Sequence, residues 1–412
     1  MDEETKKDIE KVANKGKDFK VQEVVILVLI TCIFSFFAGV SFTRIENKKS
    51  DIDSETKMSD ELKSFVKNYQ YIIDNYYEEL DEDELLGVAL ESMMELLEDP
   101  YSIYMNESDY NNLNITLEGS YKGLGISIYK NKADEEVIVS SVFKDSPAEK
   151  AGVKAGDIIV SANNIKTSTL TPTEFSQMIL NSSEEEFVLV IKRDSKEKTL
   201  KVNKSGVVIQ SVNSKVYNKN NKKVGYIYIS IFANNTYVQF KKALEELEKQ
   251  KIDSLIIDVR SNTGGHLTAV SKMISLFIDS KEIAYQLEQG DEKQVIYSTG
   301  DKTKEYPIVF LADRYSASAS EVFIISLKDN LSAKLIGEKT YGKGTVQELV
   351  TLSSGDQYKI TTKKWLSPKG TWINDTKGIE PDIQLTLSDK YYTNPSDEND
   401  NQLQRAIEEL SK

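Results

Sequence analysis

The sequence predicts a multidomain α/β protein that begins with a membrane-spanning segment, and three observations support this fold class. The chain has 412 residues, enough for two or three domains of about 150 residues each. From residue 223 onward, apolar strand-like runs alternate with amphipathic helical stretches, a pattern typical of strand–helix crossover units. Residues 115–205 contain short β runs instead, which indicates a separate β-rich module before the alternating part.

The composition excludes several classes of protein. There are 66 acidic and 52 basic residues, with a formal net charge of −14, which argues against a protein that binds nucleic-acid phosphates. The single cysteine and single histidine exclude a disulfide framework and a multi-thiolate or multi-histidine metal centre. We therefore expect no metal ion, no cofactor and no nucleic-acid partner. Any Ser-His-Asp triad would have to use His266 as its base.

Residues 24–42 predict a single membrane anchor. They carry no charged side chain, and 19 residues in a helix rise roughly 28 Å, enough to cross a bilayer core. Six lysines lie within residues 1–23, so these residues are expected to stay in the cytoplasm and the remainder to lie outside it. A buried core helix and a cleaved signal peptide are the alternatives. The long basic region and the lack of a small-x-small cleavage site favour an uncleaved anchor in the cell membrane.

Two amphipathic helices are expected after a polar tether at residues 43–60. Apolar side chains recur at three- and four-residue steps within residues 62–76 and again within residues 82–97, where the pattern ends at an Asp-Pro pair. These apolar stripes could pack on each other, on the next domain or on a second copy of the chain. We assign residues 61–114 to a helical dimerisation region.

The remaining elements follow from shorter patterns. The module at residues 115–205 has strand-like runs at residues 123–129, 136–143, 157–164, 187–193 and 198–204, with helical stretches at 146–152 and 171–180. The part at residues 206–412 has apolar strands at residues 225–232, 254–260, 307–313 and 333–338, the first three each followed by a helical stretch, and a last helix at residues 401–410.

A glycine-containing turn opens the β-rich module, where Gly123 and Gly125 flank Leu124 ahead of Ile126. Successive backbone amides in such a turn can bind an anion, and a strand edge beyond it can accept a peptide as an added strand. Taken alone, the pattern is more typical of an ordinary glycine-rich turn. The segment at residues 146–159 lies where PDZ domains carry a short helix and the next strand, so the module resembles a PDZ domain of the bacterial protease type.

That resemblance implies a specific ligand. The amides from Leu124 to Ile126, in the turn that Gly123 and Gly125 shape, would bind the carboxylate of a protein's carboxyl-terminal tail, and an apolar pocket would receive its last side chain.

Three features of residues 206–412 point to acyl transfer, and the first is a run of serines at residues 316, 318 and 320. The run follows an apolar strand and leads into a helix, so a serine there would project its hydroxyl from the sheet edge. Amides at the helix start could stabilise an oxyanion. A helix N-cap with packing alanines explains the run equally well.

The second feature is Lys343, which lies between two glycines. Residues 337–343 match the first part of a phosphate-binding P-loop, but Gly344 stands where that loop needs Ser or Thr. A solvated loop lysine is the other alternative. A buried lysine would instead be held neutral and could act as a general base, with Gln347 orienting its amine.

The third feature is the pair Gly264-Gly265 at the end of an apolar strand, where Gly264 could supply an oxyanion donor. A common strand–helix loop would look the same. Together with these features, further motifs make the chain from about residue 60 onward resemble a carboxyl-terminal processing (tail-specific) peptidase. The motifs lie at residues 99–102, 258–265, 316–321, 342–347, 364–370 and 377–382.

The resemblance implies roles for individual residues and a crotonase-like core for residues 206–412. Ser318 matches the family's nucleophile, Lys343 its general base and Gln347 the glutamine that orients the lysine. The amides of Gly264 and Ala319 match its oxyanion donors. The family often has proline where this chain has Thr263, an exchange that affects loop stiffness and leaves the Gly264 amide available. A triad role for His266 is not needed, because the Ser-Lys pair explains the chemistry without it.

The resemblance also implies an arginine that couples tail binding to the alignment of the catalytic groups, and Arg193 is our candidate, with a strand-end surface charge as the alternative. The combined prediction is a membrane-anchored, homodimeric serine endopeptidase with its catalytic part outside the cytoplasm. It would recognise free carboxyl-terminal tails and cleave by a Ser-Lys(-Gln) mechanism. A catalytically decayed tail-binding protein is the alternative, and the retention of Ser318, Lys343 and Gln347 argues against it.

Overall fold

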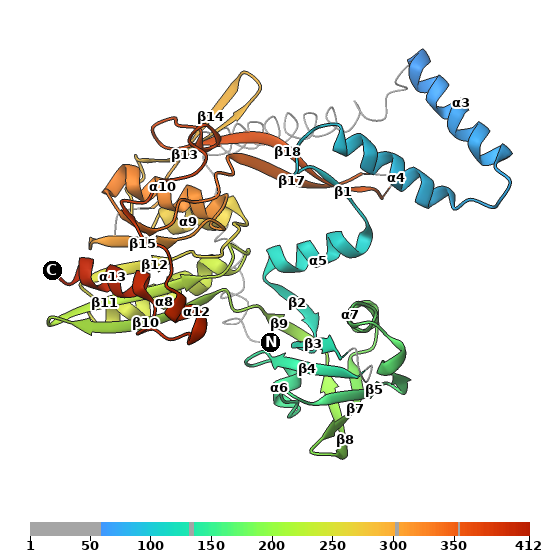
Figure 1. Cartoon of the computed structure of the whole chain (residues 1–412), viewed down its shortest axis with the longest axis horizontal. Coiled ribbons are helices and arrows are strands. Elements are labelled where there is room, and N and C mark those ends of the chain that lie inside the picture. The colour runs from blue at the N-terminus through green and yellow to red at the C-terminus, as the bar shows by residue number, and fades with distance from the viewer. Residues whose placement is uncertain (1–58, 132–135, 301–304, 353–354) are drawn as a thin grey trace, which may run out of the picture. The chain divides into compact units, whose positions relative to one another are not determined.

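The computed structural model describes residues 59–131, 136–300, 305–352 and 355–412 (Figure 1). The predicted cytoplasmic tail and membrane anchor, and all but the end of the predicted tether, lie outside these residues. None of the helices in the described ranges combines the length and hydropathy that a membrane span requires. The chain divides into two compact units, one ending at Leu86 and the other running from Gly87 to Lys412.

The described part of the first unit contains α3 (Asp60–Asn75) and the start of α4 (Glu82–Glu95), as the apolar periodicity predicted. Ser59 caps α3, since its side chain accepts a hydrogen bond from the Leu62 amide. Neither helix buries a residue completely. Several large apolar side chains of α3, including Phe65 and Ile72, are exposed, so this helix presents an apolar stripe that no other described residue covers completely.

The second unit begins with the rest of α4, then β1 (Ile103–Met105) and α5 (Glu107–Glu118). Asn106 caps α5 by accepting from the Asp109 amide, and Gly119 ends it in the left-handed region with φ of 70°. This helix was not predicted, because its polar sequence has only a weak apolar stripe.

The β-rich module is a six-stranded antiparallel sheet in the order β3-β4-β5-β7-β8, with β6 paired to β5. A second pairing, between β2 and β9, flanks the sheet. The elements are β2 (Ser120–Gly123), β3 (Ile126–Lys130), β4 (Val137–Val142), α6 (Pro147–Lys150), β5 (Ile158–Ala162), β6 (Ile165–Lys166), η1 (Thr167–Thr169), α7 (Pro172–Asn181), β7 (Glu186–Arg193), β8 (Lys196–Asn203) and β9 (Ser205–Val208). The five strands and two helical stretches expected from the sequence are all present.

The β/α part is built on a six-stranded sheet in the order β10-β11-β12-β15-β16-β19, in which only the β10–β11 pair is antiparallel. Its strands are β10 (Val212–Lys219), β11 (Lys222–Ile229), β12 (Ser254–Asp258), β15 (Ile308–Ala312), β16 (Lys334–Gly337) and β19 (Ile383–Gln384). Its main helices are α8 (Thr236–Lys249), α9 (Leu267–Ile274), α10 (Ala319–Leu331) and α13 (Asn401–Leu410). It also contains two short helices, α11 (Ile373–Thr376) and α12 (Asp389–Thr393).

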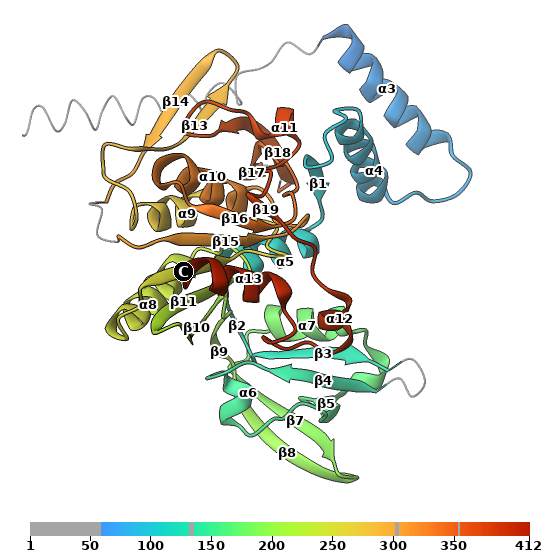
Figure 2. The ribbon, with the colours of Figure 1, turned by 60° about the vertical axis from the view of Figure 1, so that its left-hand side comes forward.

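This sheet is covered on both faces, which explains its continuous apolar strands. In β12, Leu255 and Ile257 join the core shared with α8, α9 and α10, whereas Ile256 joins the core shared with α13. Successive side chains of a strand point to opposite faces, so a strand covered on both sides needs apolar residues at every position. Figure 2 shows α9 and α10 on one side of β15 and α13 on the other.

A second sheet, which the sequence did not predict, lies beside this core. It runs β1-β18-β13-β14, with β17 paired to β18, and its further strands are β13 (Ile283–Gln289), β14 (Glu292–Tyr297), β17 (Thr345–Thr351) and β18 (Gln357–Leu366). The pairing of β1 with β18 brings Ile103 opposite Lys359. It therefore places the segment that precedes β1 next to the segment that carries Lys343.

Candidate active site

The serine run lies where β15 passes into α10, at the carboxyl end of a parallel strand. Two of its hydroxyls are used structurally, because Ser316 Oγ donates to the Val259 carbonyl and Ser320 Oγ to the Asn262 carbonyl, at 2.8 and 2.9 Å. Ser318 instead faces a cavity. Its φ of 56° and ψ of −117° are unfavourable for a residue other than glycine, a strain often found at functional sites.

One cavity of about 520 Å³ brings together residues that are far apart in the sequence. Ser318, Lys343, Gln347 and Gly264 all line it. The other lining residues include Thr263 and His266 from the glycine loop, Lys359 from β18, and Leu113, Thr116 and Leu117 from α5. The structure thus gathers the predicted nucleophile, base, glutamine and one oxyanion glycine around a single space.

The buried carboxylate of Glu321 joins the serine turn to the lysine loop. It is 0% exposed and accepts hydrogen bonds from the amides of Ser318, Gly342 and Lys343 and from the Thr340 hydroxyl. Burial raises the pKa of Glu321, and these four donors oppose the rise. The sequence analysis assigned this residue no role. The pattern Ser-x-x-Glu ahead of an apolar run, typical of a capping box, could have revealed it.

Lys343 is partly buried at the entrance to β17. Its pKa is lowered to about 8, mainly by burial and also by the charge of Lys359, while Asp99 and Glu321 oppose the shift. Its backbone is held by two indoles, since Trp365 donates to the Lys343 carbonyl and Trp372 to the Gly344 carbonyl. A buried amine with a lowered pKa is the environment that a lysine base requires.

In the described part of the chain, the predicted catalytic groups share the cavity without being hydrogen-bonded to one another. Among the described residues, no hydrogen bond joins Ser318 Oγ to Lys343 Nζ, which lies 4.4 Å from the centroid of the Tyr101 ring. Gln347 Nε2 donates to Thr345 Oγ1 and Thr361 Oγ1, at 3.0 and 2.9 Å. Such groups often align only in the complex with substrate.

Gly264 packs directly against the serine turn. Its φ is 108°, and a Cβ there would lie 2.9 Å from both the Ser318 Cβ and the Ala317 carbonyl oxygen. Only glycine therefore fits at this position. In this arrangement the Gly264 amide donates to Asn262 Oδ1 at 2.9 Å. Ala319 begins α10, where the first amides of a helix lack intrahelical partners.

A second cavity, of about 210 Å³, lies in the β-rich module at the predicted tail-binding turn. It is lined by Gly123, Leu124, Gly125 and Ile126, by the apolar Ile128, Phe175 and Ile179, and by Asn112 and Ile115 of α5, among others. The four residues of the predicted carboxylate-binding turn therefore border an apolar groove. Because α5 contributes to both cavities, one helix connects them.

Tyr121 occupies part of this turn. Its ring lies over Gly123, where a Cβ would come within 2.3 Å of the ring. Burial raises the pKa of the Tyr121 phenol, and the nearby Gly125 backbone amide opposes the rise. The phenol oxygen thus lies near one of the amides that the sequence analysis assigned to a tail carboxylate.

Two further residues considered in the sequence analysis are Arg193, the candidate for coupling tail binding to catalysis, and His266, the alternative base. Arg193 forms a bidentate ion pair with Asp157, with Nε–Oδ1 and Nη2–Oδ2 distances of 2.6 and 2.7 Å, and donates to the Gly152 carbonyl. It is not among the residues that line either of these cavities. His266 lines the catalytic cavity, and its buried Nε2 has no hydrogen-bond partner among the described residues.

Comparison with protein-family models gives three matches along the chain. Residues 223–385 match peptidase family S41, residues 138–193 match a PDZ domain, and residues 29–109 match the amino-terminal domain of the activating protease CtpB. These matches confirm both resemblances inferred from the sequence.

Individual relatives cover most of the chain. The carboxy-terminal processing protease CtpB of Bacillus subtilis is 32% identical over 367 residues, covering 87% of this chain and 76% of that protein. A probable CtpA-like serine protease of Staphylococcus epidermidis is 34% identical over 366 residues, covering 88% and 73%. Among solved structures, a photosystem II D1 C-terminal processing protease is 23% identical with a TM-score of 0.46, covering 86% of this chain and 98% of that one.

Proposed function

Because the chain belongs to peptidase family S41, as a carboxyl-terminal processing serine peptidase with a PDZ domain, we propose that it binds free carboxyl-terminal tails in the PDZ groove and cleaves an upstream peptide bond with Ser318 as nucleophile and Lys343 as general base. The observation that carries this proposal is the cavity that Ser318 lines together with a partly buried lysine whose pKa is lowered to about 8.

The reaction follows from these positions. Neutral Lys343 accepts the proton of the Ser318 hydroxyl as the serine oxygen attacks the carbonyl carbon of the substrate. The lysine ammonium then donates this proton to the leaving amine, which completes the acyl-enzyme. Water, deprotonated by Lys343, attacks the acyl-enzyme. The lysine ammonium then returns this proton to the Ser318 oxygen as the second product leaves, which restores the neutral lysine and the serine hydroxyl.

The amides of Gly264 and Ala319 stabilise the negative charge of each tetrahedral intermediate. For this, the Gly264 amide exchanges its hydrogen bond to Asn262 for one to the substrate oxygen. The close contact of Gly264 with Ser318 supports its place in the oxyanion hole.

The groove supports a preference for tails that end in an apolar residue. The carboxylate binds at the turn from Leu124 to Ile126, and the terminal side chain enters the space between Phe175 and Ile179. Tyr121 leaves the Gly125 amide when the carboxylate binds. Arg193 remains our candidate for coupling tail binding to catalysis, although its ion pair with Asp157 must then open.

We also propose that the protein is a homodimer anchored by residues 24–42, with its catalytic part outside the cytoplasm. The uncovered apolar stripe of α3 supports the dimer, because exposed side chains such as Phe65 and Ile72 recur on one face. The charge-free segment after a lysine-rich start supports the anchor. Replacing Phe65 and Ile72 with aspartate should yield monomers in sedimentation, and alkaline extraction of membranes should leave the full-length protein in the pellet.

A pair of substrates tests the central proposal. The full-length protein should cleave a quenched fluorescent peptide that ends in a free leucine carboxylate. Amidation of that terminus should reduce kcat/KM by roughly tenfold or more, since the turn then loses an anionic ligand. Equal rates for the two peptides would remove the PDZ groove from the mechanism. Tail binding without any cleavage would contradict the catalytic assignment.

A further inference from the structure

The segment Asp99-Pro100-Tyr101-Ser102 lies against the catalytic lysine, and the mechanism above does not use it. Lys343 Nζ is 4.4 Å from the centroid of the Tyr101 ring. This separation is within the range of about 6 Å over which an aromatic face attracts an ammonium group. Burial raises the pKa of the Tyr101 phenol, and the nearby phenol of Tyr341, two residues before the lysine, adds to the rise. Tyr101 therefore contacts the lysine side chain and lies near the loop that carries it.

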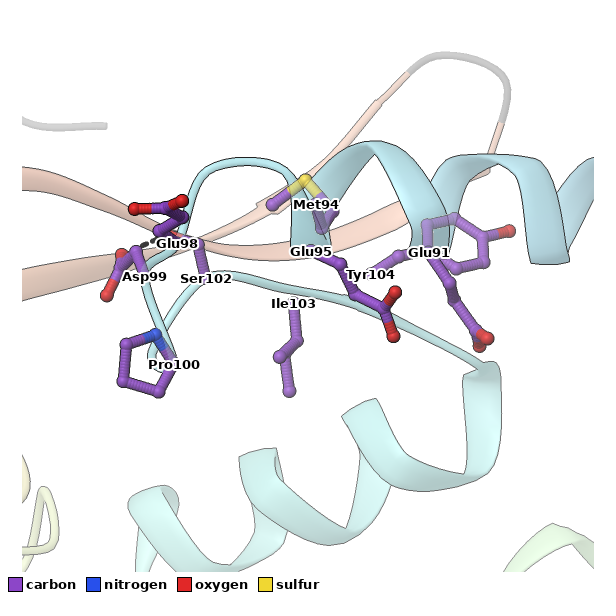
Figure 3. Close-up of a pocket in the computed structure, with 9 residues that line it drawn as sticks. All are labelled: Glu91, Met94, Glu95, Glu98, Asp99, Pro100, Ser102, Ile103 and Tyr104. Atoms are coloured by element: carbon purple, nitrogen blue, oxygen red, sulfur yellow. Dashed lines mark hydrogen bonds between the residues drawn. The ribbon is translucent and has the colours of Figure 1, made fainter.

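The segment forms a firmly held turn. The Asp99 carboxylate accepts hydrogen bonds from the Tyr101 amide at 3.1 Å and from Ser102 Oγ at 2.6 Å. Ser102 is buried, and its Oγ also accepts from the Thr361 amide in β18 at 2.9 Å. Figure 3 shows the outer side of this turn, with Asp99 and Ser102 side by side. The turn is thus attached to the strand that neighbours Lys343 and Gln347.

The same turn reaches Gln347. Thr361 Oγ1 accepts a hydrogen bond from Gln347 Nε2 at 2.9 Å. The Thr361 amide donates to Ser102 Oγ, which in turn donates to the Asp99 carboxylate. Asp99 and Ser102 therefore hold Thr361, the residue to which the Gln347 side chain is hydrogen-bonded.

We propose that the Asp99–Ser102 turn is a positioning element of the catalytic site, in which the Tyr101 ring holds the Lys343 side chain and Asp99 orients Gln347 through Thr361. This inference rests on the proposed function, because it assumes that Lys343 is the base. Tyr101 and Asp99 act through other residues and are positioning residues.

Several charged groups surround Lys343 and determine how a change at Asp99 acts. Lys359 faces it from β18, Glu321 from α10 and Asp99 from the turn, while Tyr101 presents a neutral ring. The negative charge of Asp99 stabilises the ammonium form of Lys343. Removing that charge should lower the pKa of the lysine and move the acidic limb of the pH–rate profile to lower pH.

Two substitutions at Tyr101 test the role of the ring. The Tyr101→Phe variant keeps the aromatic face and should retain kcat within roughly twofold, whereas Tyr101→Leu removes it and should reduce kcat by roughly tenfold or more. The KM of both for the free-carboxylate peptide should change by less than roughly twofold, because the tail binds in the PDZ groove. A wild-type kcat for Tyr101→Leu, or equal losses for both variants, would overturn the role of the ring.

A matched pair of acidic residues tests the role of Asp99. Glu98 is adjacent and lines the same outer pocket, but it is not among the groups that shift the pKa of Lys343 (Figure 3). Asp99→Asn should move the acidic limb of the pH–rate profile to lower pH by roughly half a unit or more, and Glu98→Gln should leave its position unchanged. An unmoved limb for Asp99→Asn, or an equal shift for Glu98→Gln, would contradict the proposal.

Two further variants separate this inference from the proposed function. Ser318→Ala and Lys343→Ala, measured with the same peptide, should be inactive. If either retains activity, the proposed mechanism is wrong. If both are inactive while Tyr101→Leu and Asp99→Asn behave like the wild type, the mechanism stands and only the positioning role is wrong.

Discussion

The backbone amides of Ser318 and Lys343 donate to the same oxygen atom, Oε2 of the buried Glu321 carboxylate, at 2.8 and 2.9 Å. The other oxygen of that carboxylate accepts from the Gly342 amide and the Thr340 hydroxyl, both at 2.6 Å. One side chain therefore joins the backbones of the proposed nucleophile and the proposed base, which are 25 residues apart in sequence.

Substituting this side chain should affect both stability and catalysis. In Glu321→Gln the amide nitrogen must face backbone donors, so we expect a loss of about 2–3 kcal/mol in the free energy of unfolding and a fall in kcat of roughly tenfold. Denaturant titration and peptide cleavage measure the two effects. Glu292→Gln, at an exposed position of β14, is the control. A Glu321→Gln variant as stable and active as this control would contradict the role of the shared carboxylate.

The lowered pKa of Lys343 predicts a pH dependence with a definite sign. The neutral amine is the active form, so kcat should rise with pH and reach half its maximum near pH 8, where the pKa of the lysine lies. Well below that pH, kcat should fall roughly tenfold per unit. The activity should disappear in Lys343→Arg, because a guanidinium stays protonated at these pH values. A rate independent of pH between 6 and 9, or an active Lys343→Arg variant, would show that another group is the base.

Gly264 should tolerate no side chain. A Cβ at this position would approach the Ser318 Cβ to 2.9 Å, and its φ of 108° disfavours any other residue. We therefore expect Gly264→Ala to reduce kcat by roughly a hundredfold, comparable with the loss of an oxyanion donor. Gly206→Ala in β9 meets no atom within 4 Å and serves as the control. Equal activities of the two variants would exclude Gly264 from the oxyanion hole.

Tyr121→Phe should strengthen tail binding. The substitution removes the phenol oxygen that lies near the Gly125 amide, so this oxygen no longer competes with a carboxylate for the amide. We expect the Kd for a labelled tail peptide to fall by roughly two- to fivefold, measured by fluorescence anisotropy on the inactive Ser318→Ala protein. Tyr129→Phe, an exposed tyrosine of β3, is the comparison. Weaker binding by Tyr121→Phe than by Tyr129→Phe would show that the phenol assists the tail.

The sequence alone was sufficient for the elements with strong local patterns. The apolar runs of β12 and β15 were recognisable because both faces of their sheet are covered. The motifs that contain Ser318 and Lys343 were equally visible, because each is a short contiguous segment. Elements without a continuous apolar run, such as β18 with its Lys-rich and Thr-rich sequence, and the polar helix α5, were missed.

What only the tertiary structure decided is which of these segments meet. The contact of Tyr101 with Lys343 depends on the pairing of β1 with β18, and such pairing between distant strands leaves no local pattern in the chain. Likewise, only the tertiary structure shows that the hydroxyls of Ser316 and Ser320 donate to backbone carbonyls, whereas Ser318, which the family resemblance had already singled out, lines the cavity. The sequence by itself determined which chemical groups this protein has, because each residue type carries its own functional group. The tertiary structure decided burial and proximity, which set the charge of the lysine and the orientation of its neighbours.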